Sequence, residues 1–110
     1  MLIDFDRIDA IRTEGFKGGV GFVSRRMFTD GVNNIIRLQL ESGASVGLHT
    51  HQGDCEMLLV LSGHGHVRYD GEEFEIHAGQ AHYCPQGHTH TVMNTGAEVM
   101  EIFAVIPRQP

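Results

Sequence analysis

The sequence has few basic residues and no cluster of them. It contains 8 Lys and Arg residues against 14 Asp and Glu residues, a formal net charge of −6, and its only adjacent basic pair is Arg25-Arg26. Proteins that bind nucleic acid need concentrated positive charge to neutralise phosphates. The composition therefore predicts no nucleic-acid partner.

Long apolar runs and a set of cysteines are also missing. No window approaches the roughly 18 apolar residues of a membrane span. Residues 1–7 carry charges where a signal peptide requires an unbroken apolar stretch. Two cysteines, Cys55 and Cys84, are too few for a disulfide framework. We therefore expect a cytoplasmic protein that makes no membrane contact and keeps both cysteines as free thiols.

Helical patterning is absent, and strand patterning takes its place. Apolar residues do not recur at three-four spacing over more than about ten residues, whereas Ile36, Leu38 and Leu40 alternate with polar residues. The 14 glycines and 3 prolines indicate many tight turns between short strands. The length suits one hydrophobic core. We predict an all-β chain in which residues 1–110 form a single domain.

Turn signals divide this chain into short strands. Asp70-Gly71 predicts a β-hairpin over residues 66–76. Residues 56–61 are apolar on both parities after Glu56, which predicts a strand covered on both faces. Many short strands separated by turns indicate a sandwich or a closed barrel. Further strands are expected at about 20–28, 34–41, 45–50, 80–84, 89–94 and 98–106.

Histidine is abundant, and all eight histidines lie between positions 49 and 90. His49 and His51 are two residues apart, so on a strand both imidazoles point to the same side. Glu56 opens the next strand after a turn and can return to the same site, and His90 begins a later strand. Three imidazoles and one carboxylate suit Fe, Mn, Ni, Co or Zn as divalent ions, and they leave up to two positions open on an octahedral ion.

Two longer patterns contain these four residues. Residues 43–63 read Gly-x5-His-x-His-x4-Glu-x6-Gly, and residues 79–94 read Gly-x5-Pro-x-Gly-x2-His-x3-Asn. Both patterns resemble the two motifs of the cupin superfamily at every defining position. The resemblance implies a conical, jelly-roll-like β-barrel of two antiparallel sheets, also called a double-stranded β-helix. It also implies one divalent transition metal per chain, held by His49, His51, Glu56 and His90.

The resemblance further implies a homodimer. Small cupins commonly pair through an outer sheet face or an exchanged N-terminal strand. In this chain the apolar surface for such pairing would come from the two-sided strand at 57–61 or from Leu2, Ile3, Phe5 and Ile8.

Candidates for a catalytic role are weaker. His88 lies two residues before His90 and is a candidate general base, although the turn after Gly87 is expected to leave it near the surface. On the strand before Pro85, either Tyr83 or the His82/Cys84 pair faces the interior, and Tyr83 is the second candidate. Cys55 adjoins Glu56 but points to the opposite face, so we expect an inert thiol.

The remaining expectations concern the interior and the arginines. A carboxylate substrate favours a bidentate guanidinium, for which the chain offers Arg25, Arg26, Arg37 and Arg68. Arg37 falls on the polar parity of its strand and is expected to face solvent. The interior is expected to be lined by Ile36, Leu38, Leu40, Leu58, Val60, Phe74, Val92, Met100 and Ile102.

Two functions from different classes fit these observations. The leading hypothesis is a metal-dependent enzyme that acts on a small organic molecule by dioxygenation, decarboxylation or isomerisation. The alternative is a non-catalytic module that binds a small ligand or metal as a sensor or accessory protein. The fold does not choose between them, but the absence of DNA-binding helices, the usual output of a sensor, favours the enzyme.

Overall fold

Ten β-strands and two short 3-10 turns make up the computed structural model, which describes residues 1–110. The 3-10 turns are η1 (Phe5–Arg7) and η2 (Phe16–Gly18), and there is no α-helix. No part of the structure is a helix that could span a bilayer. The strands are β1 (Ile11–Glu14), β2 (Phe22–Thr29), β3 (Asn33–Leu40), β4 (Ser45–Thr50), β5 (Glu56–Ser62), β6 (His64–Tyr69), β7 (Glu72–His77), β8 (Ala81–Cys84), β9 (Thr89–Asn94) and β10 (Met100–Pro107).

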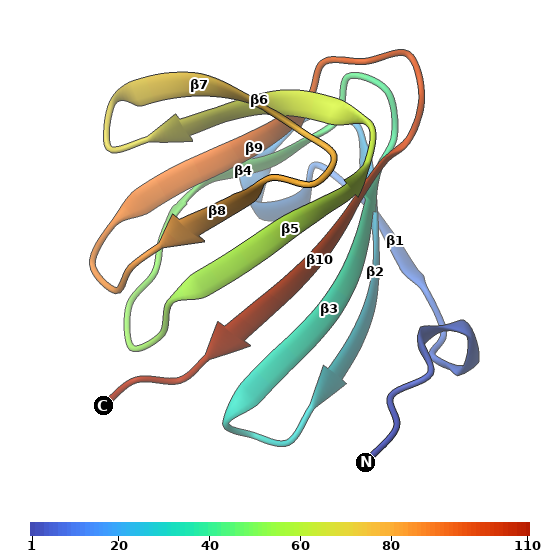
Figure 1. The fold of residues 1–110 in the computed structure, drawn as a ribbon, viewed down its shortest axis with the longest axis vertical. Helices are drawn as coiled ribbons and strands as arrows, with labels where there is room; N and C mark the ends of the chain where they lie inside the picture. The colour runs from blue at the N-terminus through green and yellow to red at the C-terminus, as the bar shows by residue number, and fades with distance from the viewer.

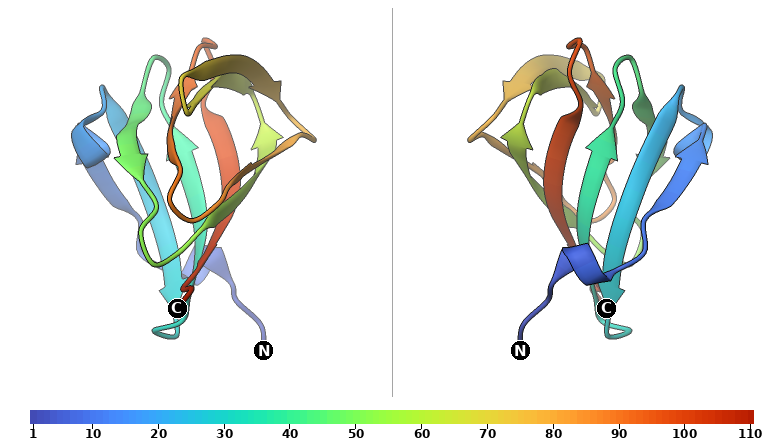
Figure 2. Two further views of the ribbon diagram at one scale, coloured as in Figure 1. Left: turned by 90° about the vertical axis from the view of Figure 1, so that its left-hand side faces the viewer. Right: turned by 90° about the vertical axis from the view of Figure 1, so that its right-hand side faces the viewer.

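The strands form two antiparallel sheets that face each other (Figures 1 and 2). One sheet has the order β1-β2-β3-β10-β5-β8, and the other has the order β4-β9-β6-β7. Side chains from both inner faces meet in one apolar cluster. The all-β prediction is confirmed, and the space between the sheets holds both the core and the candidate site.

The predicted hairpin is confirmed in its turn as well as in its strands. β6 and β7 pair antiparallel, with Tyr69 opposite Glu72. The two residues between them have positive φ angles, 49° at Asp70 and 83° at Gly71. A two-residue hairpin turn with positive φ at both positions matches the right-handed twist of its strands, and Asp-Gly tolerates that conformation.

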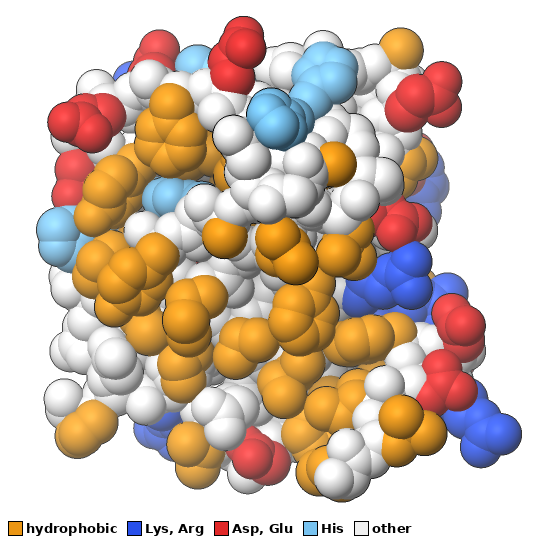
Figure 3. Space-filling model, viewed as in Figure 1, with side chains coloured by type: hydrophobic (Ala, Val, Ile, Leu, Met, Phe, Trp, Pro, Cys, Tyr) orange, Lys and Arg blue, Asp and Glu red, His pale blue; other side chains and the backbone are white.

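The strand β5 is covered on one face only, so the prediction of burial on both faces is wrong. Leu58 and Val60 are buried between the sheets, but Met57, Leu59 and Leu61 are 44%, 38% and 45% exposed. Each sheet meets the other through its inner face alone, and the N-terminal segment, whose Phe5 packs on Phe103 of β10, leaves these outer residues of β5 exposed. Figure 3 shows hydrophobic side chains gathered on this outer face, over β5, β8 and β10.

One predicted interior residue lies at an edge. Phe74 is 37% exposed because β7 and β8 are the edge strands of different sheets and do not pair with each other. Alternation identifies the inward face of a strand but not whether a neighbouring strand covers it. The other predicted interior residues are confirmed as buried: Ile36, Leu38, Leu40, Leu58, Val60, Val92, Met100 and Ile102.

Candidate metal centre

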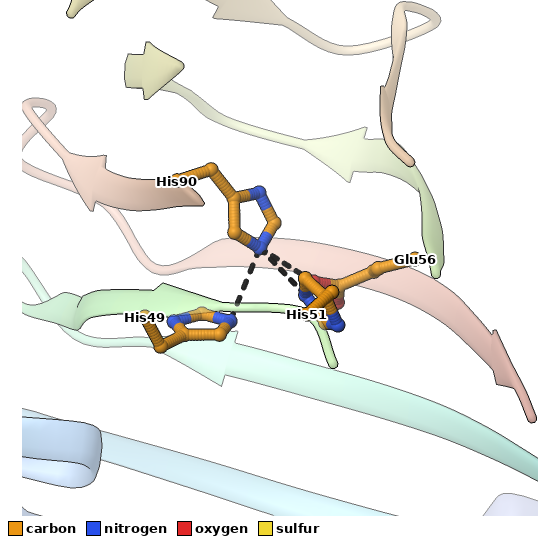
Figure 4. Close-up of side chains that lie close together, drawn as sticks. All are labelled: His49, His51, Glu56 and His90. Carbon is orange, nitrogen blue, oxygen red and sulfur yellow. Dashed lines mark hydrogen bonds and ion pairs between the residues drawn. The ribbon is translucent and has the colours of Figure 1, made fainter. Parts of the chain in front are cut away.

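Four side chains from three strands and one loop converge between the sheets (Figure 4). The Nε2 atom of His90 lies 3.0 Å from Nε2 of His51, 3.1 Å from Nε2 of His49 and 2.9 Å from Oε1 of Glu56. His51 Nε2 is 3.2 Å from the same Glu56 oxygen. All four candidate ligand atoms lie within 4.8 Å of one another. The structure therefore brings together every ligand that the sequence predicts.

A bulge in β4 turns His49 toward the interior. Val46 pairs with Val92 and His49 pairs with His90, so three steps along β4 match two along β9. The extra residue reverses the alternation. Val46 is buried, and Leu48, which a regular strand would place on the same face, is exposed instead. His49 therefore points inward, beside His90, with which it pairs across the sheet.

Gly47 sits in this bulge because another segment approaches its backbone closely. A Cβ atom at Gly47 would lie 2.0 Å from the carbonyl oxygen of Lys17. The turn η2 therefore packs directly on β4 and carries Phe16 and Lys17 to the rim of the site. A lone glycine inside a strand often marks a bulge or a close backbone contact, and here it marks both.

Substitution of Gly47 by alanine will displace η2 from β4. Because the contact at 2.0 Å is with backbone, neither side can yield by a side-chain rotation. We expect a loss of about 1–3 kcal/mol in the free energy of unfolding, typical of overpacking, measured by chemical denaturation. Gly96→Ala is the control, since a Cβ there meets only the ring of His64, at 3.0 Å. Equal stability of Gly47→Ala and Gly96→Ala would contradict this account.

Glu56 and His90 take their places from strand pairing. Glu56 is the first residue of β5 and lies opposite Cys84 of β8. His90 lies in β9, between β4 and β6, where its cross-strand neighbours are His49 and Tyr69. Both ligands are buried. The six-stranded sheet thus supplies the carboxylate, and the four-stranded sheet supplies His49 and His90.

Each imidazole has a partner at the ring nitrogen that faces away from the cluster. His49 Nδ1 lies 2.7 Å from the carbonyl oxygen of Gly47, and His51 Nδ1 lies 2.7 Å from Oδ1 of Asp54. These oxygens only accept, so both rings donate from Nδ1 and leave Nε2 unprotonated in the neutral form. Unprotonated Nε2 atoms aimed at one point are the arrangement that a metal ion requires.

The spacing of the ligand atoms also fits an ion. Ligands bonded at about 2.1 Å lie about 3.0 Å apart at right angles and about 3.4 Å apart at the tetrahedral angle. The four short separations here are 2.9, 3.0, 3.1 and 3.2 Å. These separations are closer to the spacing of ligands at right angles than to the spacing at the tetrahedral angle. The residues present therefore fit a divalent transition-metal ion as a set of three imidazoles and one carboxylate gathered around one point.

Burial and mutual contacts shift the pKa values of the cluster. Burial lowers the pKa of His49 to about 4. Burial alone would raise the pKa of Glu56, but hydrogen bonds with His51 and His90 outweigh it and lower the pKa to about 2. Burial acts to lower the pKa of His51, but its contacts with Glu56 and Asp54 outweigh burial and raise the pKa. Without a metal, His51 therefore retains a proton to a higher pH than a free imidazole does.

Metal affinity will therefore fall as the solution becomes more acidic. A raised pKa means that His51 is protonated below that pKa, and the ion must displace this proton. We expect weaker Ni(II) binding at about pH 6 than at about pH 8, with proton release on binding. Calorimetry in buffers of different ionisation enthalpy measures both quantities. An affinity that does not change over this range would contradict the assignment of His51.

The cluster opens into a small cavity of about 120 Å³. Nine of its 15 lining residues are hydrophobic, and two, Lys17 and Arg25, are basic. Arg25 lies on the inward face of β2, with its guanidinium carbon 4.4 Å from the centre of the Phe16 ring. The Nε atom of Arg25 is buried and has no hydrogen-bond partner. The sequence named Arg25 as one of four candidates, and the structure places it in this cavity.

The two weak catalytic candidates lie away from the cavity. Tyr83 lies on the outer face of β8 and is 52% exposed, so the prediction that it faces the pocket is wrong. His82 and Cys84 face inward instead, and both are buried. His88 contacts the Asp70 carboxylate and the Tyr69 hydroxyl, and it is not among the cavity-lining residues.

Both cysteines are free thiols, as predicted, and Arg37 lies on the predicted outer face of its strand. Cys55 and Cys84 are free and buried. Burial raises the pKa of Cys84 to about 11, so this thiol stays protonated. Arg37 lies on the outer face of β3, where it forms an ion pair of 2.7 Å with Glu101.

Comparisons with known proteins agree with this geometry. A family model described as "Cupin domain" matches residues 36–106. A protein of Thermotoga maritima named "Oxalate-binding protein" is 31% identical over 112 residues, which cover 96% of this chain and 93% of that one. The crystal structure of a predicted oxalate decarboxylase from Thermotoga maritima has a TM-score of 0.91, at 30% identity, with 98% and 99% of the two chains covered. An RmlC-like cupin from Shewanella frigidimarina shares the fold, with a TM-score of 0.78 at 16% identity and with 94% and 86% covered.

Proposed function

Because the chain belongs to the cupin domain family, we propose that it binds one divalent transition metal and, beside the metal, a small molecule that carries a carboxylate. The metal ligands are His49, His51, Glu56 and His90. The proposal is supported by the cluster and by the basic residues in the same cavity. The metal is Fe, Mn, Ni, Co or Zn, since the donor set of three imidazoles and one carboxylate suits all five.

The unpaired guanidinium nitrogen of Arg25 is the observation that carries the proposal. A buried donor without an acceptor costs about 1–3 kcal/mol, and Arg25 Nε is such a donor. Phe16 restrains the guanidinium plane by contact with its face. A carboxylate in the cavity would accept a hydrogen bond from this group and satisfy it.

The charge of the cavity favours an anion. A divalent ion with Glu56 carries a net charge of about +1, to which Arg25 and Lys17 each add one positive charge. The chain as a whole is negative, at −6, so the positive charge is local. The cavity, at about 120 Å³, is smaller than the roughly 300–1,000 Å³ of sites for drug-sized ligands. The expected ligand is therefore a small mono- or dicarboxylate, and the names of the Thermotoga maritima relatives point to oxalate.

Catalysis on this carboxylate is the second candidate function. A metal in this site would act as a Lewis acid or as an oxygen-binding centre, and four protein ligands would leave up to two positions of an octahedral ion for substrate. Decarboxylation comes first among the reactions because one similar structure is described as a predicted oxalate decarboxylase. Dioxygenation and isomerisation are the other reaction types. If the protein binds the ligand but does not convert it, its role is that of a sensor or accessory protein.

Calorimetry on the metal-reconstituted protein tests the proposal. Oxalate and other small carboxylates should bind saturably only when the metal is present. Oxamide, a neutral molecule of similar size, should not bind. Failure of every small carboxylate to bind the loaded protein would overturn the carboxylate proposal. Release of carbon dioxide or consumption of oxygen by the complex would identify an enzyme, and an unchanged ligand would identify a binding module.

We also propose that the chain is one domain that forms a homodimer in the cytoplasm. Its free cysteines suit a reducing compartment. The outer face of β5, with Met57, Leu59 and Leu61 exposed, is the apolar surface that a second copy would cover (Figure 3). Sedimentation should give the mass of two chains, and Leu59→Glu should give the mass of one. A monomeric wild-type protein would exclude the dimer.

A further inference from the structure

We infer that His82 is a positioning residue for the metal centre: when the metal is bound, it accepts a hydrogen bond from Nδ1 of His90 and so keeps Nε2 of that ligand free for the metal. The inference rests on the proposed metal site and adds a residue to it. His82 occupies none of the defining positions of the two sequence patterns.

The contact between the two histidines is direct and buried. His82 Nε2 lies 3.0 Å from His90 Nδ1. His82 is 6% exposed and comes from β8 of the six-stranded sheet, whereas His90 comes from β9 of the four-stranded sheet. The hydrogen bond therefore joins the two sheets at the cluster. The partners of His49 and His51, by contrast, lie within three residues of them along the chain.

Only one direction of this hydrogen bond is compatible with a metal. If His82 donated to His90 Nδ1, a neutral His90 would carry its proton on Nε2. That proton would point at Glu56 and at the other imidazoles, where the ion must be. If His90 donates from Nδ1, its Nε2 atom has a free lone pair, and His82 carries its proton on Nδ1. The ligand role of His90 therefore requires an acceptor at the position of His82 Nε2.

Aromatic neighbours hold the His82 ring in the orientation that this bond needs. The Tyr69 ring packs against it edge to face, with centres 5.4 Å apart and planes at 72°. The Phe74 ring does the same, at 5.6 Å and 63°. Both residues belong to the β6–β7 hairpin. Phe74, at the seam between β7 and β8, thus supports the metal centre through His82.

Three substitutions of His82 separate hydrogen bonding from packing. His82→Phe keeps an aromatic ring between Tyr69 and Phe74 but removes the acceptor, and His82→Leu is a second variant without an acceptor. His82→Gln restores an acceptor, because its amide oxygen reaches the position of Nε2. His88→Gln is the matched control, since His88 is a partly exposed histidine outside the cavity. Each protein is titrated with Co(II), its visible absorption spectrum is recorded, and its metal-free melting temperature is measured.

We expect His82→Phe and His82→Leu to bind Co(II) about 10–100-fold more weakly than wild type, the usual effect of losing an outer partner of a ligand. Their Co(II) spectra should change as well. His82→Gln should recover most of the affinity and spectrum, and His88→Gln should match wild type.

Wild-type affinity and spectrum in His82→Phe would overturn the inference and leave the metal site intact. Equal weakening in the Phe, Leu and Gln variants, with lower metal-free melting temperatures, would show a packing role and also overturn it. A wild-type protein that binds no Co(II) would remove the metal site and the inference together.

Discussion

Replacement of His90 by alanine is expected to weaken Ni(II) or Co(II) binding by at least about 100-fold, because loss of an outer partner alone costs 10–100-fold. The Nε2 atom of His90 is the one candidate ligand atom within 3.1 Å of the other three. Its removal leaves His49, His51 and Glu56, a three-ligand set without the atom that lies nearest to all the others. Equilibrium dialysis against each metal measures the loss.

The same variant separates metal-dependent stability from intrinsic stability. A metal at about 1,000 times its dissociation constant stabilises the wild-type fold by about 4 kcal/mol, and with 100-fold weaker binding the same concentration should stabilise His90→Ala by no more than about 1.4 kcal/mol. The control is His88→Ala, which removes a partly exposed histidine that contacts Asp70 and Tyr69. If His88→Ala lost the metal as fully as His90→Ala, the assignment of His90 would be wrong.

Substitution of Arg25 by methionine is expected to weaken carboxylate binding by about 10–100-fold without changing metal affinity. A hydrogen bond to a charged group contributes about 1.5–3 kcal/mol, and 1.4 kcal/mol corresponds to a factor of ten. Methionine keeps much of the length and the apolar contact with Phe16 but removes the charge and the donors. Calorimetric titration of the metal-loaded variant with oxalate measures the change.

Two further variants sharpen this result. Arg25→Lys keeps the positive charge but not the planar fork, so it should lie between wild type and Arg25→Met. Arg68→Met is the control, because Arg68 is exposed and pairs with Glu73 outside the cavity. Full carboxylate affinity in Arg25→Met would show that the anion, if it binds, does so without Arg25.

The metal ligands were predictable because their spacing is a local property of the chain. His49 and His51 share a side through a two-residue interval, and Glu56 and His90 each open or nearly open a strand. The bulge in β4 was not foreseen, although Gly47 within a strand was its available signal. Without that extra residue, His49 would point away from the interior.

The supporting residues depend on contacts that spacing does not determine. For the strand 81–84, alternation allowed either Tyr83 or the His82/Cys84 pair to face inward, and pairing of β8 with β5 decides for His82 and Cys84. Among four arginines, the sequence set aside only Arg37 and left three candidates for an anion site. The structure shows that Arg25 of β2 lines the same cavity as the cluster.

The two wrong predictions about burial, for β5 and for Phe74, concern whether a face of a strand is covered. The outer residues of β5, such as Leu59, are as apolar as its inner ones, so the sequence resembled a strand covered on both sides. Phe74 has the parity of an interior residue but lies on an edge strand. In both cases the sequence specifies which face a side chain takes, and the sheet order decides whether that face is covered.

The most direct test of the central claim is the metal content of the wild-type protein, purified without a histidine tag and measured by elemental mass spectrometry. The cluster of His49, His51, Glu56 and His90 predicts about one equivalent of Fe, Mn, Ni, Co or Zn per chain, present on isolation or taken up on reconstitution. Absence of all five metals, with no uptake after incubation with each, would contradict the account.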